Sequence, residues 1–173
     1  MTITITITIL GDTKNRNISS RANAKIGYIL AVAGEFGSSA KGLEELKKGM
    51  KESYYINYHK NPVLYPEISD KIGLNTKHPY AMMDASDGLA DCIYQISTKS
   101  KVKINVDYDL IPKKVDNKDF VLYGGEDYAL VAALHQDDFN KTDGLIKIGT
   151  VEAGAGIYLD NEKIEYKGYN HFE

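Results

Sequence analysis

The hydrophobic and polar positions of this chain follow two periods, one typical of strands and one typical of helices. Residues 2–9 read Thr-Ile four times, a strict alternation that predicts a strand with one apolar and one hydroxylated face. Shorter apolar runs predict further strands at residues 26–33, 81–84, 102–106, 129–134 and 145–151. Residues 156–166 read as a hairpin that turns at Asp160 and Asn161.

Helical spacing appears in two longer segments. Ala40, Leu43, Leu46 and Met50 predict a helix that opens near residue 39 and continues toward residue 54 or beyond. The second follows Asp87, with apolar side chains at Leu89, Cys92 or Ile93, and Ile96, and residues 67–74 suit a shorter helix. Strands with at least two long helices between them predict an α/β (α+β) domain, a mixed sheet with flanking helices.

Composition narrows the class of protein. With 173 residues, 43% hydrophobic and 26% charged, the chain suits one soluble globular domain with a real core. No apolar run approaches a membrane span and no leader precedes one, so we expect a cytoplasmic protein without a membrane partner. The net charge of −3 gives no footprint for nucleic acid. The single cysteine, Cys92, excludes an internal disulfide and lies on the apolar side of its helix.

Three short polar side chains crowd the junction between the strand 81–84 and the helix that follows. Asp84 and Asp87 could hold a hard divalent cation, while the helix N-terminus behind them presents free N–H groups to an anion. Together these groups suit a metal-chelated polyphosphate. The alternative is structural: Ser86 is an N-cap, and the aspartates only favour the helix dipole.

Two glycine-bearing segments leave similar alternatives open. Residues 124–128 read Gly-Gly-Glu-Asp-Tyr between the apolar runs 120–123 and 129–134, and glycine pairs are costly inside a strand. Either a bulge or close backbone approach to a ligand, or a simple hairpin corner, would explain them. Residues 34–39 could cradle a phosphate before a helix, although a plain turn with a serine cap explains them as well.

At this point the ordered motifs resemble those of the thiamine-monophosphate kinase family. That family shares a superfamily with aminoimidazole ribonucleotide synthetase, selenophosphate synthetase and a hydrogenase maturation factor. The similar segments are Arg-Ala-Asn-Ala-Lys-Ile-Gly at 21–27, Gly-Ser-Ser-Ala-Lys-Gly-Leu at 37–43, Asp-Ala-Ser-Asp-Gly-Leu at 84–89, Gly-Gly-Glu-Asp-Tyr at 124–128, Ile-Gly-Thr-Val at 148–151 and Lys-Gly-Tyr-Asn-His-Phe at 167–172. The resemblance implies the fold of the C-terminal domain of that superfamily.

The resemblance also implies an activity and a set of site residues. The implied reaction is ATP-dependent phosphorylation of thiamine monophosphate to thiamine diphosphate. The family's Mg²⁺ ligands match Asp84 and Asp87, its nucleotide contacts match Arg21 and Ser86, and its substrate contacts match Glu126 and Tyr169. Phosphoryl transfer depends on positioning and charge neutralisation more than on a protein nucleophile, so no residue is assigned as a catalytic base.

The sequence departs from the family in several places. Tyr123 stands where the family has Ser, Ala129 where it has Glu, Ser38 where it has Asp, and residues 62–66 lack the family's Arg. The family's N-terminal domain, with its Gly-Asp-Asp motif, has no counterpart in this sequence. Residues 1–12 resemble the last strand of that domain, and residues 13–173 resemble the C-terminal kinase domain.

Two hypotheses follow from this resemblance. The chain is either a kinase half completed by a separate N-terminal polypeptide, or a non-catalytic remnant or binding module for nucleotide or thiamine phosphates. We expect no activity from the chain alone, because too few metal ligands remain to clamp a triphosphate. We also expect a homodimer through residues 2–9, because an alternating strand edge without Lys, Pro or Gly has no protection against pairing.

Overall fold

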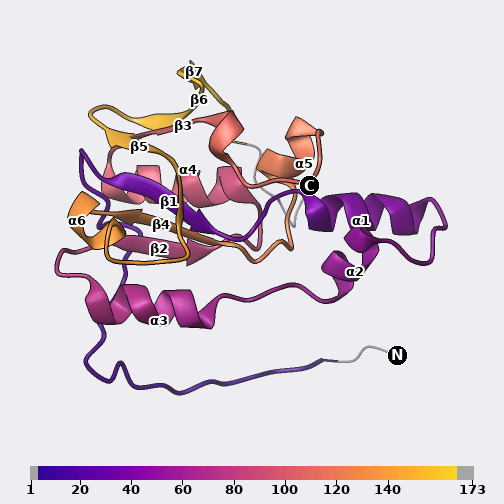
Figure 1. The fold of residues 1–173 in the computed structure, drawn as a ribbon, viewed down its shortest axis with the longest axis horizontal. Coiled ribbons are helices and arrows are strands. Elements are labelled where there is room, and N and C mark those ends of the chain that lie inside the picture. The colour runs from indigo at the N-terminus through magenta and orange to yellow at the C-terminus, as the bar shows by residue number, and fades with distance from the viewer. Residues whose placement is uncertain (1–3, 167–173) are drawn as a thin grey trace.

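One mixed sheet organises the part of the chain that is described. The computed structural model describes residues 4–166, and within them seven strands form a sheet in the order β2-β4-β1-β5-β3-β6-β7 (Figure 1). The strands are β1 (Ile29–Ala33), β2 (Ala81–Asp84), β3 (Lys103–Val106), β4 (Leu130–Leu134), β5 (Ile146–Glu152), β6 (Gly156–Leu159) and β7 (Glu162–Lys163). Neighbouring strands are antiparallel, except that β3 and β6 run parallel. The predicted α/β fold with a mixed sheet is confirmed.

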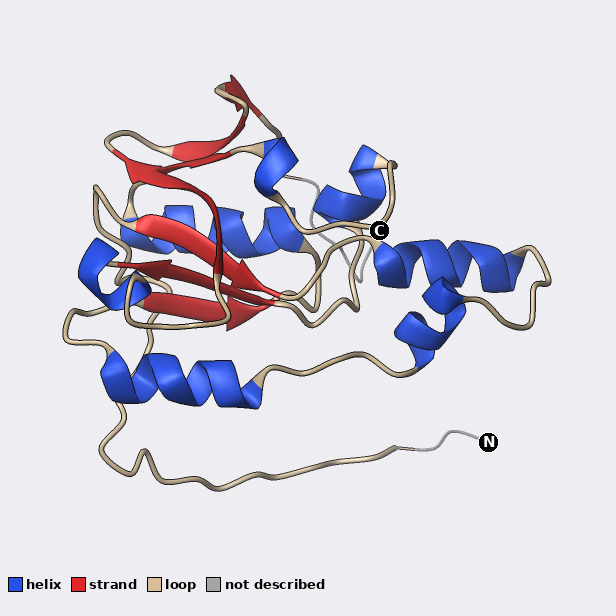
Figure 2. Cartoon of the chain, in the orientation of Figure 1, coloured by secondary structure: helices blue, strands red, loops and turns tan. Residues whose placement is uncertain are grey.

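Helices flank this sheet (Figure 2). They are α1 (Ser38–Lys47), α2 (Tyr54–Lys60), α3 (Pro66–Asn75), α4 (Leu89–Ser100), α5 (Lys118–Tyr123) and α6 (Gln136–Phe139), with a short 3₁₀ helix η1 (Tyr108–Leu110). In Figure 1, α4 lies behind the sheet, while α1 and α2 extend beyond its end. The predicted helices at residues 67–74 and after Asp87 are confirmed as α3 and α4.

The two faces of the sheet carry separate apolar cores. The side chains of β4 alternate: Val131 and Ala133 belong to the larger core, which includes Cys92 and Ile93 of α4. Leu130, Ala132 and Leu134 belong to a smaller core on the other face, together with Ile72 of α3. All five residues of β1 and of β4 are buried, as continuous apolar runs in central strands should be. Cys92 is a buried free thiol, as predicted.

The predicted helix through residue 54 is wrong. Helix α1 ends at Lys47 because Gly49 adopts a left-handed backbone, with φ 84°, where the chain reverses. The amide of Gly49 donates to Leu46 O at 3.0 Å and that of Met50 donates to Glu45 O at 3.1 Å, which is the Schellman pattern of a helix end. A new helix, α2, then begins after Ser53, whose side chain accepts from Ile56 N at 3.0 Å.

The apolar run 120–123 forms the end of helix α5 and not a strand. Asn117 caps this helix, accepting from Phe120 N at 3.1 Å. Residues 124–128 are therefore a loop between a helix and β4, neither a bulge nor a hairpin corner. A short apolar run fits the period of a strand as well as that of a helix, and here the capping residue Asn117 is the sequence feature that indicates the helix. The hairpin over β6 and β7 is confirmed, with Asp160 and Asn161 at φ 52° and 68° in its turn.

The strand predicted for residues 2–9 is absent from its described part. Residues 4–10 carry no strand and are exposed, with Ile5, Ile7 and Ile9 at 80%, 80% and 86% exposure. Figure 1 shows this segment extending below α3, apart from the sheet. A strand needs a neighbour for its backbone N–H and C=O groups, and no strand of the described chain pairs with this segment.

Candidate functional site

The candidate site lies where β2 leaves the sheet and α4 begins. Strand β2 is the outermost strand on its side, and its last residue, Asp84, is paired with Leu130 of β4. The amide of the next residue, Ala85, donates to Ala129 O at 2.8 Å, so the chain stays fixed to β4 for one more residue. The loop that follows carries Ser86 and Asp87 toward the start of α4.

The predicted Ser86 cap is wrong, because Gly88 is the N-cap of α4. Gly88 has φ 97°, and no side chain caps the helix. Asp84 and Asp87 are exposed, and within residues 4–166 no hydrogen bond or ion pair is recorded for either carboxylate. The two carboxylates are therefore available to a ligand, and neither makes a hydrogen bond to the start of the helix.

A second loop packs directly against this one. The amide of Glu126 donates to Ser86 O at 2.7 Å, and the amide of Tyr128 donates to Ala85 O at 3.1 Å. A Cβ at Gly125 would lie 2.7 Å from Ser86 O, and a Cβ at Gly88 would lie 2.9 Å from Gly124 O. Glycine is required because the two backbones approach this closely. The paired glycines thus serve the contact between loops.

Glu126 projects from the second loop in a constrained conformation. Its backbone has φ 66° and that of Tyr128 has φ 52°, left-handed values that non-glycine residues adopt rarely. The Tyr128 hydroxyl donates to Glu126 Oε2 at 3.1 Å, and this hydrogen bond is the main reason that the pKa of Tyr128 is raised. Strained residues of this kind concentrate at functional sites, which makes Glu126, beside Ser86, a candidate site residue.

Asp127 has a role that the sequence did not reveal. Its side chain is fully buried, and its two oxygens accept from Gly37 N at 2.6 Å and Ser39 N at 2.9 Å. Burial raises the pKa of Asp127 to about 6, although the two backbone hydrogen bonds oppose that shift. These bonds occupy the N-terminus of α1, so residues 34–39 present neither a phosphate cradle nor a serine cap.

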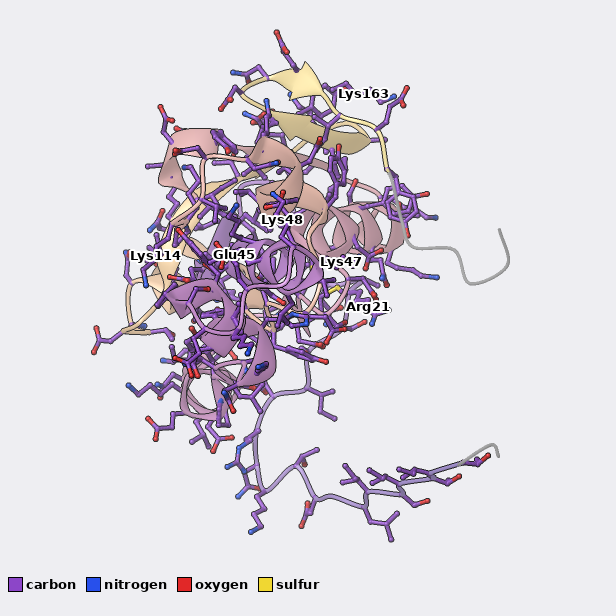
Figure 3. The ribbon with its side chains drawn as sticks, turned by 90° about the vertical axis from the view of Figure 1, so that its right-hand side faces the viewer. Arg21, Glu45, Lys47, Lys48, Lys114 and Lys163 are labelled. Atoms are coloured by element: carbon purple, nitrogen blue, oxygen red, sulfur yellow. The ribbon has the colours of Figure 1, made fainter. Side chains whose placement is uncertain are left out.

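Arg21 lies along α4 and not within the two loops. Its Nη1 donates to Gln95 Oε1 at 2.5 Å, and its backbone oxygen accepts from Ser100 Oγ at 2.7 Å. In Figure 3, which looks along α1, Arg21 and Lys163 lie to one side of that helix and Lys114 lies to the other. Tyr169, the remaining predicted site residue, lies outside the described residues. Of the predicted site residues, the structure therefore brings Asp84, Ser86, Asp87 and Glu126 together in two adjacent loops.

The carboxylates of the site suit a metal ion that is coordinated partly by substrate phosphates better than one enclosed by the protein alone. Among residues 4–166, no three His, Cys, Asp or Glu side chains are grouped closely enough to enclose a metal ion. Mg²⁺ keeps several waters and is commonly held by one or two carboxylates together with substrate phosphates. Asp84 and Asp87, both exposed, fit that limited role. No helix within the same described range is long and apolar enough to cross a bilayer.

Among known sequences, the chain is similar to thiamine-monophosphate kinases from several organisms. No family model matches the chain. The thiamine-monophosphate kinase of Aquifex aeolicus is 30% identical over 187 residues, covering 98% of this chain and 59% of the relative. That of Archaeoglobus fulgidus is 32% identical over 160 residues, covering 88% and 52%. The chain thus spans little more than half the length of these relatives, and it matches their C-terminal part.

Solved structures agree with the sequence match. A ThiL protein complexed with AMPPCP and TMP superposes with a TM-score of 0.78 at 29% identity, covering 90% of this chain and 55% of the other. The thiamine monophosphate kinase of Aquifex aeolicus gives a TM-score of 0.74 at 28% identity, covering 86% and 55%. The hydrogenase maturation protein HypE in complex with ATP, at 14% identity and a TM-score of 0.67, covers 86% and 54% and shares the fold alone. The predicted similarity to the aminoimidazole ribonucleotide synthetase-like fold is confirmed.

Proposed function

This chain matches the C-terminal part of thiamine-monophosphate kinase, and from that premise we propose that it forms one half of an ATP-dependent phosphotransferase. The proposed reaction transfers a phosphoryl group from ATP to thiamine monophosphate and yields thiamine diphosphate and ADP. The observation that carries the proposal is the contact between residues 84–88 and residues 124–128. It brings the exposed carboxylates of two distant segments to one edge of the sheet.

The proposed roles follow from the placement of each group. Asp84 and Asp87 would hold Mg²⁺, which on binding supplies positive charge that offsets the charge of the nucleotide phosphates. Ser86, between them, offers a hydroxyl at the entrance to α4, where the first N–H groups of the helix favour an anion. Arg21 would contact the nucleotide, and Glu126 and Tyr169 would contact thiamine monophosphate.

No residue is proposed as a general base. Phosphoryl transfer depends mainly on alignment and charge stabilisation, and the exposed groups of the site can provide both. Asp127, which neighbours Glu126 in the sequence, is unsuited to proton transfer because both of its oxygens accept backbone N–H groups of α1. Its proposed role is structural: it holds the second loop against the N-terminus of α1.

A second candidate function is binding without turnover. It is favoured by the small number of oxygen ligands, since two exposed carboxylates cannot clamp a triphosphate as an enclosed site would. The departures from the family at Tyr123 and Ser38, and the Arg missing from residues 62–66, favour it as well. The Ser38 hydroxyl donates to Glu35 Oε1 at 2.6 Å, so this donor is already used within the chain. Under this alternative the chain is a cytoplasmic binding module for nucleotide or thiamine phosphates.

The partners proposed for the kinase half are ATP, thiamine monophosphate and a separate N-terminal polypeptide. A homodimer through residues 2–9 is the form proposed for the chain by itself. The Thr/Ile alternation, exposed over residues 4–9, supports both, because either partner could pair with it along one edge and cover its apolar face.

Calorimetric titration with Mg·ATP tests the proposed site. The wild-type chain should bind Mg·ATP, and the double variant Asp84→Asn/Asp87→Asn should lose the Mg²⁺-dependent part of that binding while its melting temperature stays within a few degrees. Asp116→Asn/Asp119→Asn is the matched control, since both residues are exposed and belong to the segment around α5. Equal binding by the wild type and the site variant would contradict the proposed roles of Asp84 and Asp87.

A further inference from the structure

A chain of hydrogen bonds along α4 ends at the guanidinium of Arg21. Asp91 Oδ2 accepts from Gln95 Nε2 at 2.5 Å, and Gln95 Oε1 accepts from Arg21 Nη1 at 2.5 Å. Asp91 and Gln95 are four residues apart and therefore lie above one another on the same face of the helix. Of these three residues, Asp91 and Gln95 belong to α4 and Arg21 does not.

The backbone of Arg21 is fixed at the opposite end of the same helix. Ser100 Oγ donates to Arg21 O at 2.7 Å and accepts from Ala24 N at 3.0 Å. Ser100 and Gln95 are five residues apart, or about 7–8 Å along the helix axis. The side chain of Arg21 thus runs from the C-terminal end of α4 toward its N-terminus, where Ser86 and Asp87 lie.

Asp91 determines which end of the Gln95 amide faces Arg21. An ionised carboxylate only accepts hydrogen bonds, so the group of Gln95 that meets Asp91 must be its NH₂. The carbonyl oxygen of the same amide then faces the other way and can accept from a guanidinium. If the amide were reversed, its NH₂ would face Arg21, and two donors would meet.

The Asp91 carboxylate is shielded as well as oriented. The residue is 6% exposed, and its second oxygen accepts from the Tyr166 hydroxyl at 2.9 Å. The ring of Tyr166 stacks on that of Tyr94, with centroids 4.0 Å apart. Asp91 also lies in the first turn of α4, where the helix dipole favours a negative charge. A buried, fixed carboxylate of this kind holds the Gln95 amide in one orientation.

We propose that Gln95 and Asp91 are positioning residues that hold the Arg21 guanidinium along α4 for contact with the nucleotide phosphates. This inference rests on the proposed function for the assignment of Arg21 to the nucleotide. Gln95 contacts Arg21 itself, and Asp91 acts one step further away by fixing the amide. Neither residue needs to touch the ligand, because a pre-positioned guanidinium loses less side-chain freedom on binding.

The first experiment measures the order of Arg21 without any ligand. The sequence contains two arginines, Arg16 and Arg21, so a protein labelled with ¹⁵N-arginine gives two Nε–Hε signals. Arg16 is held by Asp70 at 2.9 Å and serves as the internal reference. Gln95→Met, which keeps the length and helix propensity of the side chain, should lower the order parameter of Arg21 below about 0.6 and leave Arg16 unchanged.

Two further variants separate positioning from general loosening of the fold. Asp91→Asn should lower the order of Arg21 as Gln95→Met does, because the amide orientation is no longer fixed. Tyr166→Phe removes a hydrogen bond to the same carboxylate but none on the path to Arg21, so the order of Arg21 should persist. An Arg21 signal that is already disordered in the wild type, or unaffected by Gln95→Met, would overturn the positioning role.

The second experiment measures Mg·ATP binding by the full chain. Gln95→Met should weaken binding by about 5- to 10-fold, the scale of a lost charge-assisted hydrogen bond acting indirectly. Arg21→Met should weaken it further, and Arg21→Met/Gln95→Met should bind as Arg21→Met does, because Gln95 acts only through Arg21. Gln136→Met, an exposed glutamine bonded to Asn140 on α6, is the matched control and should bind as the wild type does.

The outcomes of the two experiments are distinguishable. If Gln95→Met weakens binding equally with and without Arg21, the residue acts by another route and the positioning role is refuted. If the wild type does not bind Mg·ATP while the order of Arg21 still depends on Gln95, the proposed function fails and the structural restraint on Arg21 stands.

Discussion

The buried carboxylate of Asp127 gives the sharpest test of how the two loops are held. Its pKa is raised from 3.8 to about 6, chiefly by burial, against the opposing effect of two backbone hydrogen bonds. A shift of about two pH units corresponds to about 3 kcal/mol of free energy. Because the folded pKa lies above the unfolded one, the folded state keeps its proton longer. The stabilising contribution is complete below pH 4 and is lost as the pH rises through 6.

The variant Asp127→Asn isolates this contribution. The Asn side chain carries no charge at any pH. Its NH₂ group cannot accept from an amide N–H, so the variant loses one of the two hydrogen bonds from Gly37 and Ser39, at a cost that does not change with pH. Only the wild type then gains or loses a charge. The difference in unfolding free energy, wild type minus Asp127→Asn, should fall by about 3 kcal/mol between pH 4 and pH 7.

Denaturant unfolding at pH 4, 5, 6 and 7 measures this difference, because the midpoint shift multiplied by the slope gives the free energy at each pH. Asp143→Asn, an exposed carboxylate after α6, is the control and should show no such trend. A difference that rises with pH would show that the two N–H groups outweigh burial and that the carboxylate is stabilised in its charged form. That result would refute the reasoning.

Three further predictions concern the loops, the activity and the N-terminal segment. Gly125→Ala should destabilise the fold by about 1–3 kcal/mol and weaken Mg·ATP binding, because its Cβ would meet Ser86 O at 2.7 Å; equal stability in a thermal melt would argue against the tight loop contact. The purified chain alone should release no ADP that depends on thiamine monophosphate, and robust turnover in a coupled assay would refute this. Deleting residues 2–9 should convert a dimer into a monomer by light scattering, so an intact chain that is already monomeric would remove the argument.

Much of the architecture was determined by local sequence. The continuous apolar runs of β1 and β4 could be satisfied only between two covered faces, and the helical spacing of Leu89, Ile93 and Ile96 required an amphipathic helix behind them. Which of these segments are strands and which are helices follows from the spacing of their apolar residues, since each side-chain period matches one backbone geometry. The short run 120–123 was ambiguous because four residues cannot distinguish the two periods.

The tertiary structure decided how the site is assembled. No local rule could show that Glu126 N would donate to Ser86 O, because the partners are 40 residues apart and meet only when β2 pairs with β4. The cap of α1 likewise comes from Asp127, far along the chain from Gly37, so the serines beside that glycine gave a misleading signal. For residues 2–9 the alternation specifies two faces and no partner, and pairing depends on whichever backbone is available to accept its hydrogen bonds.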